Sequence, residues 1–553
     1  MLPFKVNTKK GVATMYVAEL KKKQGSKTYN SILIRESYRD NGKVKHRTIA
    51  NISKLPTEHI RQLKASLRGE KGEFKVSDLG IGRSYEYGGS FVLRELAKDI
   101  GLDKAIFSRA TQWRENILAM ISGRILHQGS KLNLVNTYMD TALWEIAGHK
   151  FGVRPDVEKD CYQPMDELLK RKDIIERKLA KKHLKQGTIL LYDITNTWLE
   201  GEYKDSKIVK YGRGKGGKRG YRQVSIGLLT NAEGCPVGIE IFKGNTSDQT
   251  TVLDQIKKIS EKYGIKEAVF VGDRGMLTQK RINEIDSDYF KIVTALTHTE
   301  LSSIIKKENI QMDLFDEMNI TEIIDSENNK MRYMLCKNEK EKIKERNTRE
   351  ALIKKVEVLL TRKAAVKKKR DKKKTCAAIG RIFEQNKIEK FFLWDVDDNG
   401  KLSWSRKEEK IEEEKSLDGC YVIKTNVSKV MNKENVVEAY QGLQKVEQAF
   451  KNMKTVLLEL RPIYHKSDDR IIAHVFIVML AYYLQWHFMQ KVASLFVGDG
   501  EGDERRWSFD IIIKRLKSIT RVEQLIENIV VKINISKPDM EQNKILSLLN
   551  IKL

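Results

Sequence analysis

Apolar and polar positions alternate differently in successive parts of the chain. Residues 1–80 hold alternating, β-prone segments, two of which are joined through Asn41-Gly42, a strong hairpin signal, before a helical stretch that opens at Leu55-Pro56. Residues 81–187 carry the helical apolar period, in FVLRELAKDIGL and in ENILAMISGRIL. The pattern predicts a small basic module of a β-hairpin and a helix, followed by a helical region.

From residue 188 to 297 short apolar runs alternate with amphipathic stretches. The runs TILLYD, GYRQVSIGLLTN, PVGIEIFKGN, EAVFVGD and YFKIVTAL read as strands, with helices predicted over Thr250–Tyr263 and residues 278–285. Three strands, a helix, a strand, a helix and a strand form the ribonuclease H-like order. Asp193 ends the first of these strands and Asp273 ends the fourth. The fold class expected is a multi-domain α/β protein with a ribonuclease H-like mixed sheet and helical flanking regions.

A different pattern interrupts this core over residues 298–433. The stretch Lys363–Lys374 has eight basic residues and one acid, and FFLWDVDDNGKLSWSR has a hairpin turn signal. These features predict a mostly β insertion with a basic helical arm. The lysine run is either a solvated helix face or a nucleic-acid contact, and the sequence does not choose between them.

The chain returns to a helical pattern after the insertion. Residues 434–490 are predicted to complete the core, and 491–553 to form a C-terminal helical region that is a candidate for dimerisation. The apolar stretch Ile471–Met489 approaches transmembrane length, but it contains His474, Gln485 and His487. It is predicted to be a helix buried in a large core, with a membrane span as the alternative.

Charge and cysteine content narrow the classes of function. Of the 553 residues, 103 are Lys or Arg and 75 are Asp or Glu, giving a net charge of +28. This excess indicates a polyanionic partner, with nucleic acid first and an anionic membrane surface second. Residues 81–187 are therefore a candidate DNA-binding or accessory region. Five scattered cysteines with no CxxC pair argue against a disulfide framework or zinc ribbon and favour a reduced, cytoplasmic protein.

Glu447 stands out on the helix predicted over residues 434–459. The helical period places on one face Val436, Tyr440, Leu443, Phe450 and Lys454, and Glu447 falls in the middle of that face. A carboxylate on a buried helix face needs a counter-charge, a proton or a metal ion. For Glu447 alone, an internal Arg or Lys partner is the simpler explanation.

Asp193, Asp273 and Glu447 together favour a metal site. Three carboxylates share a site as anions only with a compensating cation, because like charges raise each other's pKa. Oxygen ligands suit Mg²⁺ or Mn²⁺, and two such ions about 4 Å apart activate a water or a sugar hydroxyl for attack on a phosphodiester. The sequence shows no His/Cys cluster that would suit zinc. The three acids therefore indicate metal-dependent cutting of a nucleic acid held by basic residues.

The ordered motifs resemble insertion-sequence transposases of the DDE type, in the branch with the signature Y-x2-R-x3-E-x6-K. Tyr440, Glu447 and Lys454 have the required spacing, whereas Leu443 takes the Arg position, with Lys445 as a candidate substitute. Further matching stretches are the YDxT element Tyr192–Thr195, the DRG element Asp273–Gly275, Gly227–Asp248, Glu459–His465 and Arg470–Phe476.

The resemblance implies that Asp193, Asp273 and Glu447 are the catalytic and metal-ligating residues, with two Mg²⁺ or Mn²⁺ ions per site. It implies binding of terminal inverted repeats, strand cleavage, and joining of the 3′ ends to target DNA in cut-and-paste transposition. A homodimer is expected in the synaptic complex, in the cytoplasm of a bacterial or archaeal cell, at the nucleoid and without a membrane partner.

The resemblance also places Tyr440 and Lys454 at the DNA backbone near the cut end. Other candidate DNA contacts are Lys445, Arg461 and four residues of the glycine-rich loop Lys207–Arg222, namely Arg213, Lys215, Lys218 and Arg219. Two alternatives stay open from the residues: a ribonuclease H-like nuclease without strand transfer, and a non-catalytic basic DNA-binding protein whose carboxylates pair with Arg and Lys.

Overall fold

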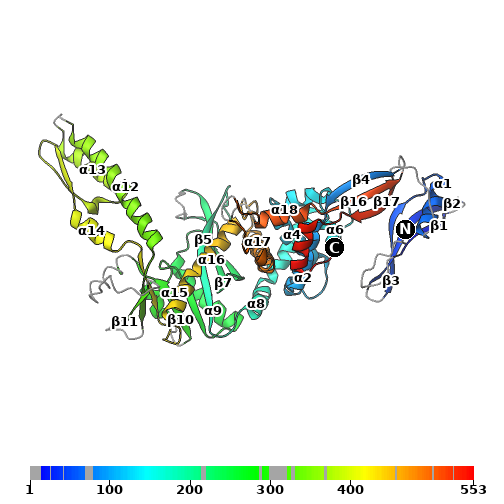
Figure 1. Cartoon of the computed structure of the whole chain (residues 1–553), viewed down its shortest axis with the longest axis horizontal. Helices are drawn as coiled ribbons and strands as arrows, with labels where there is room; N and C mark the ends of the chain where they lie inside the picture. Colours follow the sequence, from blue (N-terminus) through cyan, green and yellow to red (C-terminus); the bar gives the residue numbers. More distant parts are fainter. Residues whose placement is uncertain are drawn as a thin grey trace.

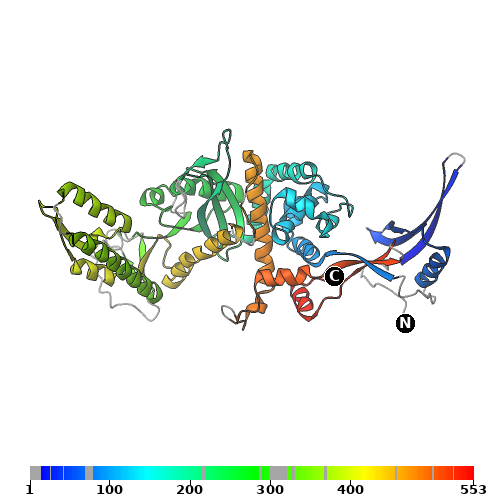
Figure 2. The same cartoon turned by 90° about the horizontal axis from the view of Figure 1, so that it is seen from above.

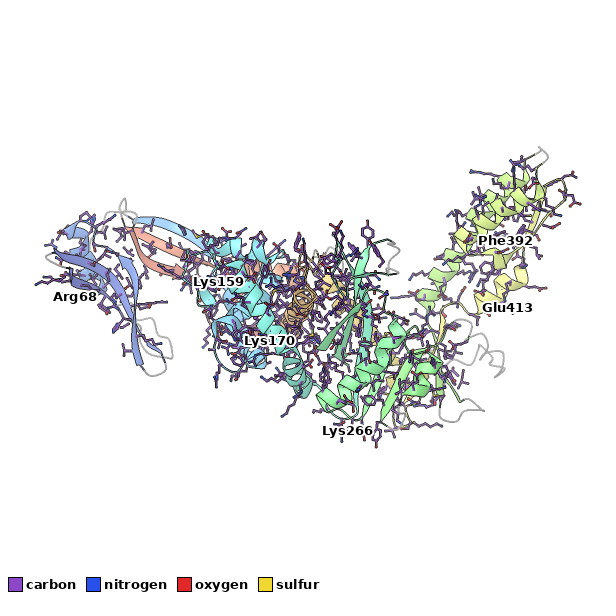
Figure 3. All side chains as sticks on the ribbon, turned by 180° about the vertical axis from the view of Figure 1, so that it is seen from behind. Arg68, Lys159, Lys170, Lys266, Phe392 and Glu413 are labelled. Carbon is purple, nitrogen blue, oxygen red and sulfur yellow. The ribbon has the colours of Figure 1, made fainter. Side chains whose placement is uncertain are left out.

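The computed structural model describes residues 14–24, 27–40, 43–68, 79–212, 220–285, 289–297, 300, 320–324, 331–366, 370–454, 458–461, 463–500, 504–526 and 529–553. The protein is elongated, with a three-stranded module at one end, a helical arm at the other, and a large sheet and a helical body between them (Figure 1). Figure 3 labels Arg68 on the first of these ends and Phe392 on the second.

The N-terminal module is an antiparallel sheet covered by one helix. Its elements are β1 (Thr14–Gln24), β2 (Lys27–Asp40), β3 (Lys43–Asn51) and α1 (Thr57–Leu67). The predicted turn at residues 41–42 lies outside the described residues. The core of the module contains Ile34, Ile52, Leu55, Ile60 and Leu63, together with Ile526 from the far end of the chain. A residue distant in sequence thus helps to build this module.

A second small sheet connects this module to the helical body. Its elements are β4 (Leu79–Glu86), β16 (Thr520–Ile526) and β17 (Ile529–Ile535), in the order β17-β16-β4. The prediction that residues 491–553 are helical is therefore wrong for the β16–β17 hairpin, whose β-branched residues alternate with polar ones. Helices of this region are η5 (Ala493–Phe496), α18 (Phe509–Lys517) and α19 (Met540–Leu549).

The helical body is built around α17 (Asp468–Lys491), which stands between the body and the large sheet (Figure 2). Among helices in the described ranges, α17 alone has the length and apolar composition to cross a membrane, and 83% of its most apolar window is buried inside the protein. This burial is what a core helix requires. The other elements are α2 (Gly88–Asp99), α3 (Leu102–Ile106), α4 (Gln112–Leu126), α5 (Lys131–Asn136), η2 (Thr137–Met139), α6 (Leu143–Ile146), η3 (Val157–Tyr162), α7 (Gln163–Lys170) and α8 (Lys172–His183).

The large sheet confirms the ribonuclease H-like order. Its central strands are β5 (Thr188–Leu199), β7 (Arg222–Asn231), β8 (Pro236–Lys243), β9 (Ala268–Gly272) and β10 (Phe290–Ala295). They lie in the order β8-β7-β5-β9-β10, with the first two pairs antiparallel and the last two parallel. Associated elements are β6 (Lys210–Tyr211), α9 (Asp248–Tyr263) and α10 (Gln279–Glu284).

The inserted region divides between the sheet and the arm. Three strands extend the sheet beyond β10, namely β15 (Cys420–Thr425), β12 (Arg332–Lys337) and β11 (Ile320–Ile324). The arm consists of α12 (Glu339–Ala364), α13 (Lys372–Asn386), η4 (Glu389–Phe391), β13 (Phe392–Val396), β14 (Leu402–Arg406) and α14 (Glu408–Ser416). The described part of 298–433 is therefore more helical than the predicted mostly β insertion. The reason is a helical stripe, Ile353, Val356 and Leu360, that packs with Ile379 and Phe383 in a separate core.

The helix predicted over 434–459 is two helices in the structure, α15 (Lys433–Gln441) and α16 (Leu443–Lys454), which meet at Gly442. This break changes which residues face the sheet.

Candidate active site

Asp193 and Asp273 lie next to each other on parallel neighbouring strands. Tyr192 of β5 is paired with Gly272 of β9, and each acid is the next residue along its chain. Neighbouring strands are separated by about 4.8 Å. The two carboxylates therefore start from adjacent backbone positions, which is compatible with the predicted shared site.

The two acids differ in how firmly the fold holds them. The prediction that β5 ends at Asp193 is wrong, because the strand continues to Leu199 along β7 while β9 stops at Gly272. The β-branched and aromatic residues after Asp193 keep the strand going. Asp193 is half-buried inside this strand, and Asp273 is exposed beyond the end of β9.

A tight turn fixes the backbone of Asp273. Its carbonyl accepts hydrogen bonds from the N–H groups of Met276 and Leu277, at 2.9 and 3.2 Å. The Arg274 N–H donates to Asp273 Oδ1 at 2.8 Å. Met276 and Leu277 are buried, so the turn is anchored in the core and the carboxylate is held at the surface of the sheet edge.

Helix α16 lies along the face of β5 that carries Asp193. At the start of the helix, a Cβ at Gly442 would lie 3.3 Å from Leu191 Cδ1. At its end, Lys454 Nζ donates a hydrogen bond to Thr195 Oγ1. Leu191, Asp193 and Thr195 alternate along the strand and so share one face. The helix therefore spans the position of Asp193.

Glu447 sits midway along this helix, but it does not lie on the buried stripe. The buried residues of α16 are Leu443, Val446, Ala449, Phe450 and Met453, and Glu447 is exposed. The prediction that Glu447 occupies the apolar face is wrong, because the break at Gly442 separates α16 from the face of Val436 and Tyr440. An exposed carboxylate beside the sheet can turn toward the strands without breaking core packing.

Tyr440 lies near two of the three acids, Asp273 and Glu447. Burial, the nearby Asp273 and, more weakly, Glu447 together raise the pKa of its phenol to about 12, while Arg274 opposes the rise. Tyr440 thus lies within electrostatic reach of both acids. At neutral pH the phenol keeps its proton and is a hydrogen-bond donor at the edge of the site.

The donor set fits a hard divalent cation. Carboxylate oxygens are the ligands that Mg²⁺ and Mn²⁺ prefer, and Asp193, Asp273 and Glu447 offer three of them along one sheet face. These side chains are not drawn tightly together: among described residues, the group of three ligands packed within 4.8 Å is His183, Cys235 and His487. Closing the acidic site requires rotation of the exposed Asp273 and Glu447 side chains.

Comparisons with known proteins show the family of the chain. A family model described as the transposase DDE domain matches residues 186–484, more than half of the 553 residues. The chain belongs to the DDE transposase family. A second model, the N-terminal domain of IS1634 family transposases, matches residues 18–77 of this transposase, which covers its N-terminal module.

Two further comparisons concern whole proteins. A comparison with curated proteins gives no match. The transposase is also similar to a chain in a cryo-EM structure of the piggyBac transposase synaptic complex with hairpin DNA, with 10% identity over 78% of this chain and 76% of that chain and a TM-score of 0.33.

Family membership defines the enzyme class. The protein is a DDE transposase, an enzyme that cleaves and transfers DNA strands, and such transposases generally use divalent metal ions. The branch with the Tyr-Arg-Glu-Lys signature stays a prediction, as do the individual DNA contacts.

Of the residues predicted to contact DNA, some are described by the structure and others are not. Lys445 Nζ donates to the Ala232 carbonyl at 2.8 Å, in the turn between β7 and β8. This bond gives Lys445 a structural role that its spacing in the signature did not indicate. The loop residues Arg213, Lys215, Lys218 and Arg219 lie outside the described residues.

Arg461 lines a cavity of about 770 Å³ that also reaches Lys454 and Tyr464. Its guanidinium carbon lies 3.5 Å from the centroid of the Trp198 ring, a cation–π contact. Burial lowers the pKa of Arg461, and its Nη1 is buried without a hydrogen-bond partner. The guanidinium is therefore packed against Trp198, and the contact of Arg461 with DNA stays a prediction.

Sequence reasoning missed two features of the site. Thr195 follows Asp193 by two residues on the same strand face and binds Lys454, and this alternation was visible in the sequence. The cluster of His183, Cys235 and His487 had no signal, because its members come from distant segments of the chain. The sequence showed no His/Cys cluster that would suit zinc, whereas the structure brings these three ligand atoms within 4.8 Å of one another.

Proposed function

We propose that this transposase binds the terminal inverted repeats of an insertion sequence, cleaves DNA strands with two divalent ions and joins the 3′ ends to target DNA, in cut-and-paste transposition. The observation that carries the proposal is the meeting of Asp193 and Asp273 where β9 ends, with α16 and its Glu447 lying along the same face.

Asp193, Asp273 and Glu447 would hold Mg²⁺ or Mn²⁺, which when bound activates a water or 3′ hydroxyl for attack and stabilises the leaving oxygen. The strand backbone fixes Asp193, and the anchored turn fixes Asp273. Tyr440, protonated at neutral pH, and Lys454, at the end of α16, would donate hydrogen bonds to phosphate oxygens beside the acids.

The proposed partners follow from charge and from the reaction. A net charge of +28 suits a polyanion such as DNA, and joining two element ends calls for a homodimer in the synaptic complex. All five cysteines are free, which suits the reducing cytoplasm of a bacterial or archaeal cell, where the transposase would work at the nucleoid.

Replacing Glu447 by glutamine is expected to abolish metal-dependent nicking at the element boundary. The amide keeps the size of the side chain but loses the negative charge that holds a cation, so the cleavage rate should fall by at least about 100-fold. The measurement uses a labelled duplex carrying the element's own end, with Mg²⁺ or Mn²⁺. The matched control is Glu438→Gln, an exposed glutamate on the neighbouring α15, which should cleave normally.

The same assay separates the competing functions. Joining of the cut 3′ end to a second duplex supports transposition, whereas nicking without joining would indicate a nuclease. Binding of the duplex by the unaltered protein without any metal-dependent nicking would contradict the catalytic proposal and favour a DNA-binding protein.

Lys454→Ala is expected to weaken binding of the element end about 10- to 100-fold, because a charge-assisted contact to phosphate is lost. The dependence of binding on salt should also become shallower, by about one phosphate contact. Titrations of a labelled duplex at several salt concentrations measure both. The control is Lys451→Ala, because Lys451 is an exposed lysine on the same helix, and this substitution should change binding less. Equal effects of the two substitutions would show that Lys454 has no special contact.

A further inference from the structure

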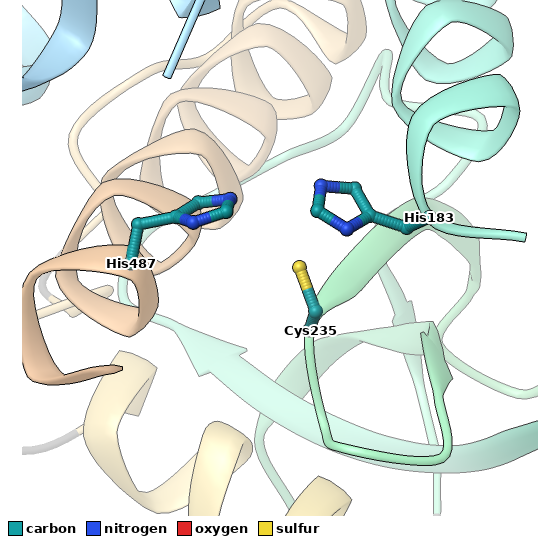
Figure 4. A group of neighbouring side chains, drawn as sticks. All are labelled: His183, Cys235 and His487. Atoms are coloured by element: carbon teal, nitrogen blue, oxygen red, sulfur yellow. The ribbon is translucent and has the colours of Figure 1, made fainter. Parts of the chain in front are cut away.

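Three side chains that can bind a metal ion come together from distant parts of the chain, where α8, α17 and the turn between β7 and β8 meet. His183 ends α8, Cys235 closes the turn between β7 and β8, and His487 lies in the last part of α17 (Figure 4). One ligand atom from each lies within 4.8 Å of the other two. We propose that His183, Cys235 and His487 bind one zinc ion, which fastens the catalytic sheet to the helical body.

The thiol of Cys235 and one ring nitrogen of each histidine are available to bind a metal ion inside the protein. Cys235 is fully buried, with 0% of its surface exposed, and the two histidines are half-buried. His487 Nε2 is buried and has no hydrogen-bond partner. His183 Nε2 lies 2.9 Å from the Tyr483 hydroxyl, which leaves its other ring nitrogen for a metal. A buried, unpaired imidazole nitrogen destabilises the fold unless a ligand completes it.

Two imidazoles and one thiol suit zinc better than magnesium or calcium. Zinc binds nitrogen at about 2.0–2.1 Å and thiolate sulfur at about 2.3 Å in tetrahedral sites. Ligand atoms in such a tetrahedron are separated by about 3.3–3.8 Å, so modest side-chain rotations from the present spacing close the site. Water completes the fourth position.

The protonation states of the three side chains suit the binding of zinc. Burial lowers the pKa of His183 to about 4 and that of His487 to about 3, so both rings are neutral at physiological pH. Burial raises the pKa of the Cys235 thiol, and the nearby Lys182 opposes this rise. Binding of hydrated Zn²⁺ would replace Zn–water bonds with two Zn–N bonds and one Zn–S bond, the displaced waters would return to solvent, and the thiol proton would pass to water.

A zinc ion bound here would connect elements that position the helix α16. The turn that holds Cys235 also accepts hydrogen bonds from Lys445 of α16, at Ala232, and from Trp486 of α17, at the Glu233 carbonyl at 3.3 Å. Zinc would hold this turn to α8 and α17, and the turn holds the start of α16. The helix bearing Glu447 would thus be positioned from behind. This effect on cleavage rests on the proposed function, but the binding of zinc does not.

The test measures metal in the full-length protein purified without chelators. About one zinc per chain is expected by mass spectrometry of the metal content, and Co²⁺ in its place should give a sulfur-to-cobalt charge-transfer band. Cys235→Ser and His487→Gln should each lose the zinc, the band and the rise in thermal unfolding temperature on adding zinc. Cys376→Ser, a thiol in the arm, is the matched control and should keep all three.

A second control separates this inference from the proposed function. Asp273→Asn removes a proposed catalytic acid and should retain the zinc, whether or not the unaltered protein cleaves DNA. Wild-type protein without zinc and without a cobalt band, or Cys235→Ser protein that loads zinc as fully as wild type, would overturn the proposal. If Cys235→Ser does not fold, the cobalt band of the wild type and its loss in His487→Gln decide the matter.

Discussion

Asp273→Asn is expected to abolish metal-dependent cleavage of the element end while DNA binding stays unchanged. The substitution keeps the shape of the side chain and the anchored turn, so the change is confined to the charge at the end of β9. Loss of a metal-holding carboxylate should slow cleavage by at least about 1,000-fold. Nicking of a labelled duplex and its binding are measured side by side.

Asp254→Asn is the matched control, because Asp254 is an exposed aspartate on α9, outside the proposed site. It should cleave at the normal rate. Asp193→Asn should fail in the same way as Asp273→Asn, since both acids start from adjacent backbone positions. Near-normal cleavage by either Asp193→Asn or Asp273→Asn would remove that residue from the active site.

Glu176→Ala is expected to destabilise the fold by about 3–5 kcal/mol, the largest stability effect that we predict. Glu176 is fully buried, and its carboxylate forms ion pairs with Lys172 and Lys258 at 3.0 and 2.7 Å. It also accepts hydrogen bonds from the Ile239 N–H and the Tyr263 hydroxyl, at 2.9 and 3.2 Å. These contacts join α8, β8 and α9, and their removal leaves two buried ammonium groups short of a counter-charge.

Asp173→Ala tests the same helix with an exposed pair. Asp173 and Lys262 form an ion pair at 2.6 Å, but both side chains are about half exposed. Its loss should change stability by no more than about 1 kcal/mol. Urea and thermal unfolding followed by circular dichroism compare the two variants. Equal, small effects would mean that Glu240, the other acid near these lysines, holds them without Glu176.

The order of the sheet was predictable because its strands are short apolar runs separated by clear turns. The two aspartates follow such runs, so a shared site could be predicted, whereas the pairing of β5 with β9 is known only from the structure. The exposure of Glu447 could not be inferred from the sequence, because a sequence pattern does not show that the predicted helix breaks at Gly442. Each residue rotates a helical position by about 100°, so a break changes which side chains face the core.

Contacts between segments that are distant in sequence could not be predicted from the sequence pattern either. The sequence predicted residues 298–433 as a separate, mostly β insertion, because the pairing of β15 with β10, and of β12 with β15, depends on how the chain returns to the sheet. His183, Cys235 and His487 carry no short spacing, so only the packing of α8 and α17 against the sheet brings them together.

The place of Ile526 has a consequence for how the molecule is made. During synthesis the strands β1–β3 and α1 emerge from the ribosome before Ile526 of β16, which completes their hydrophobic core. A chain released before residue 520 would leave that core open beside the strands β1–β3. Only a polypeptide extended past residue 526 therefore has the complete core of this module, and a product terminated earlier lacks the contribution of Ile526 to that core.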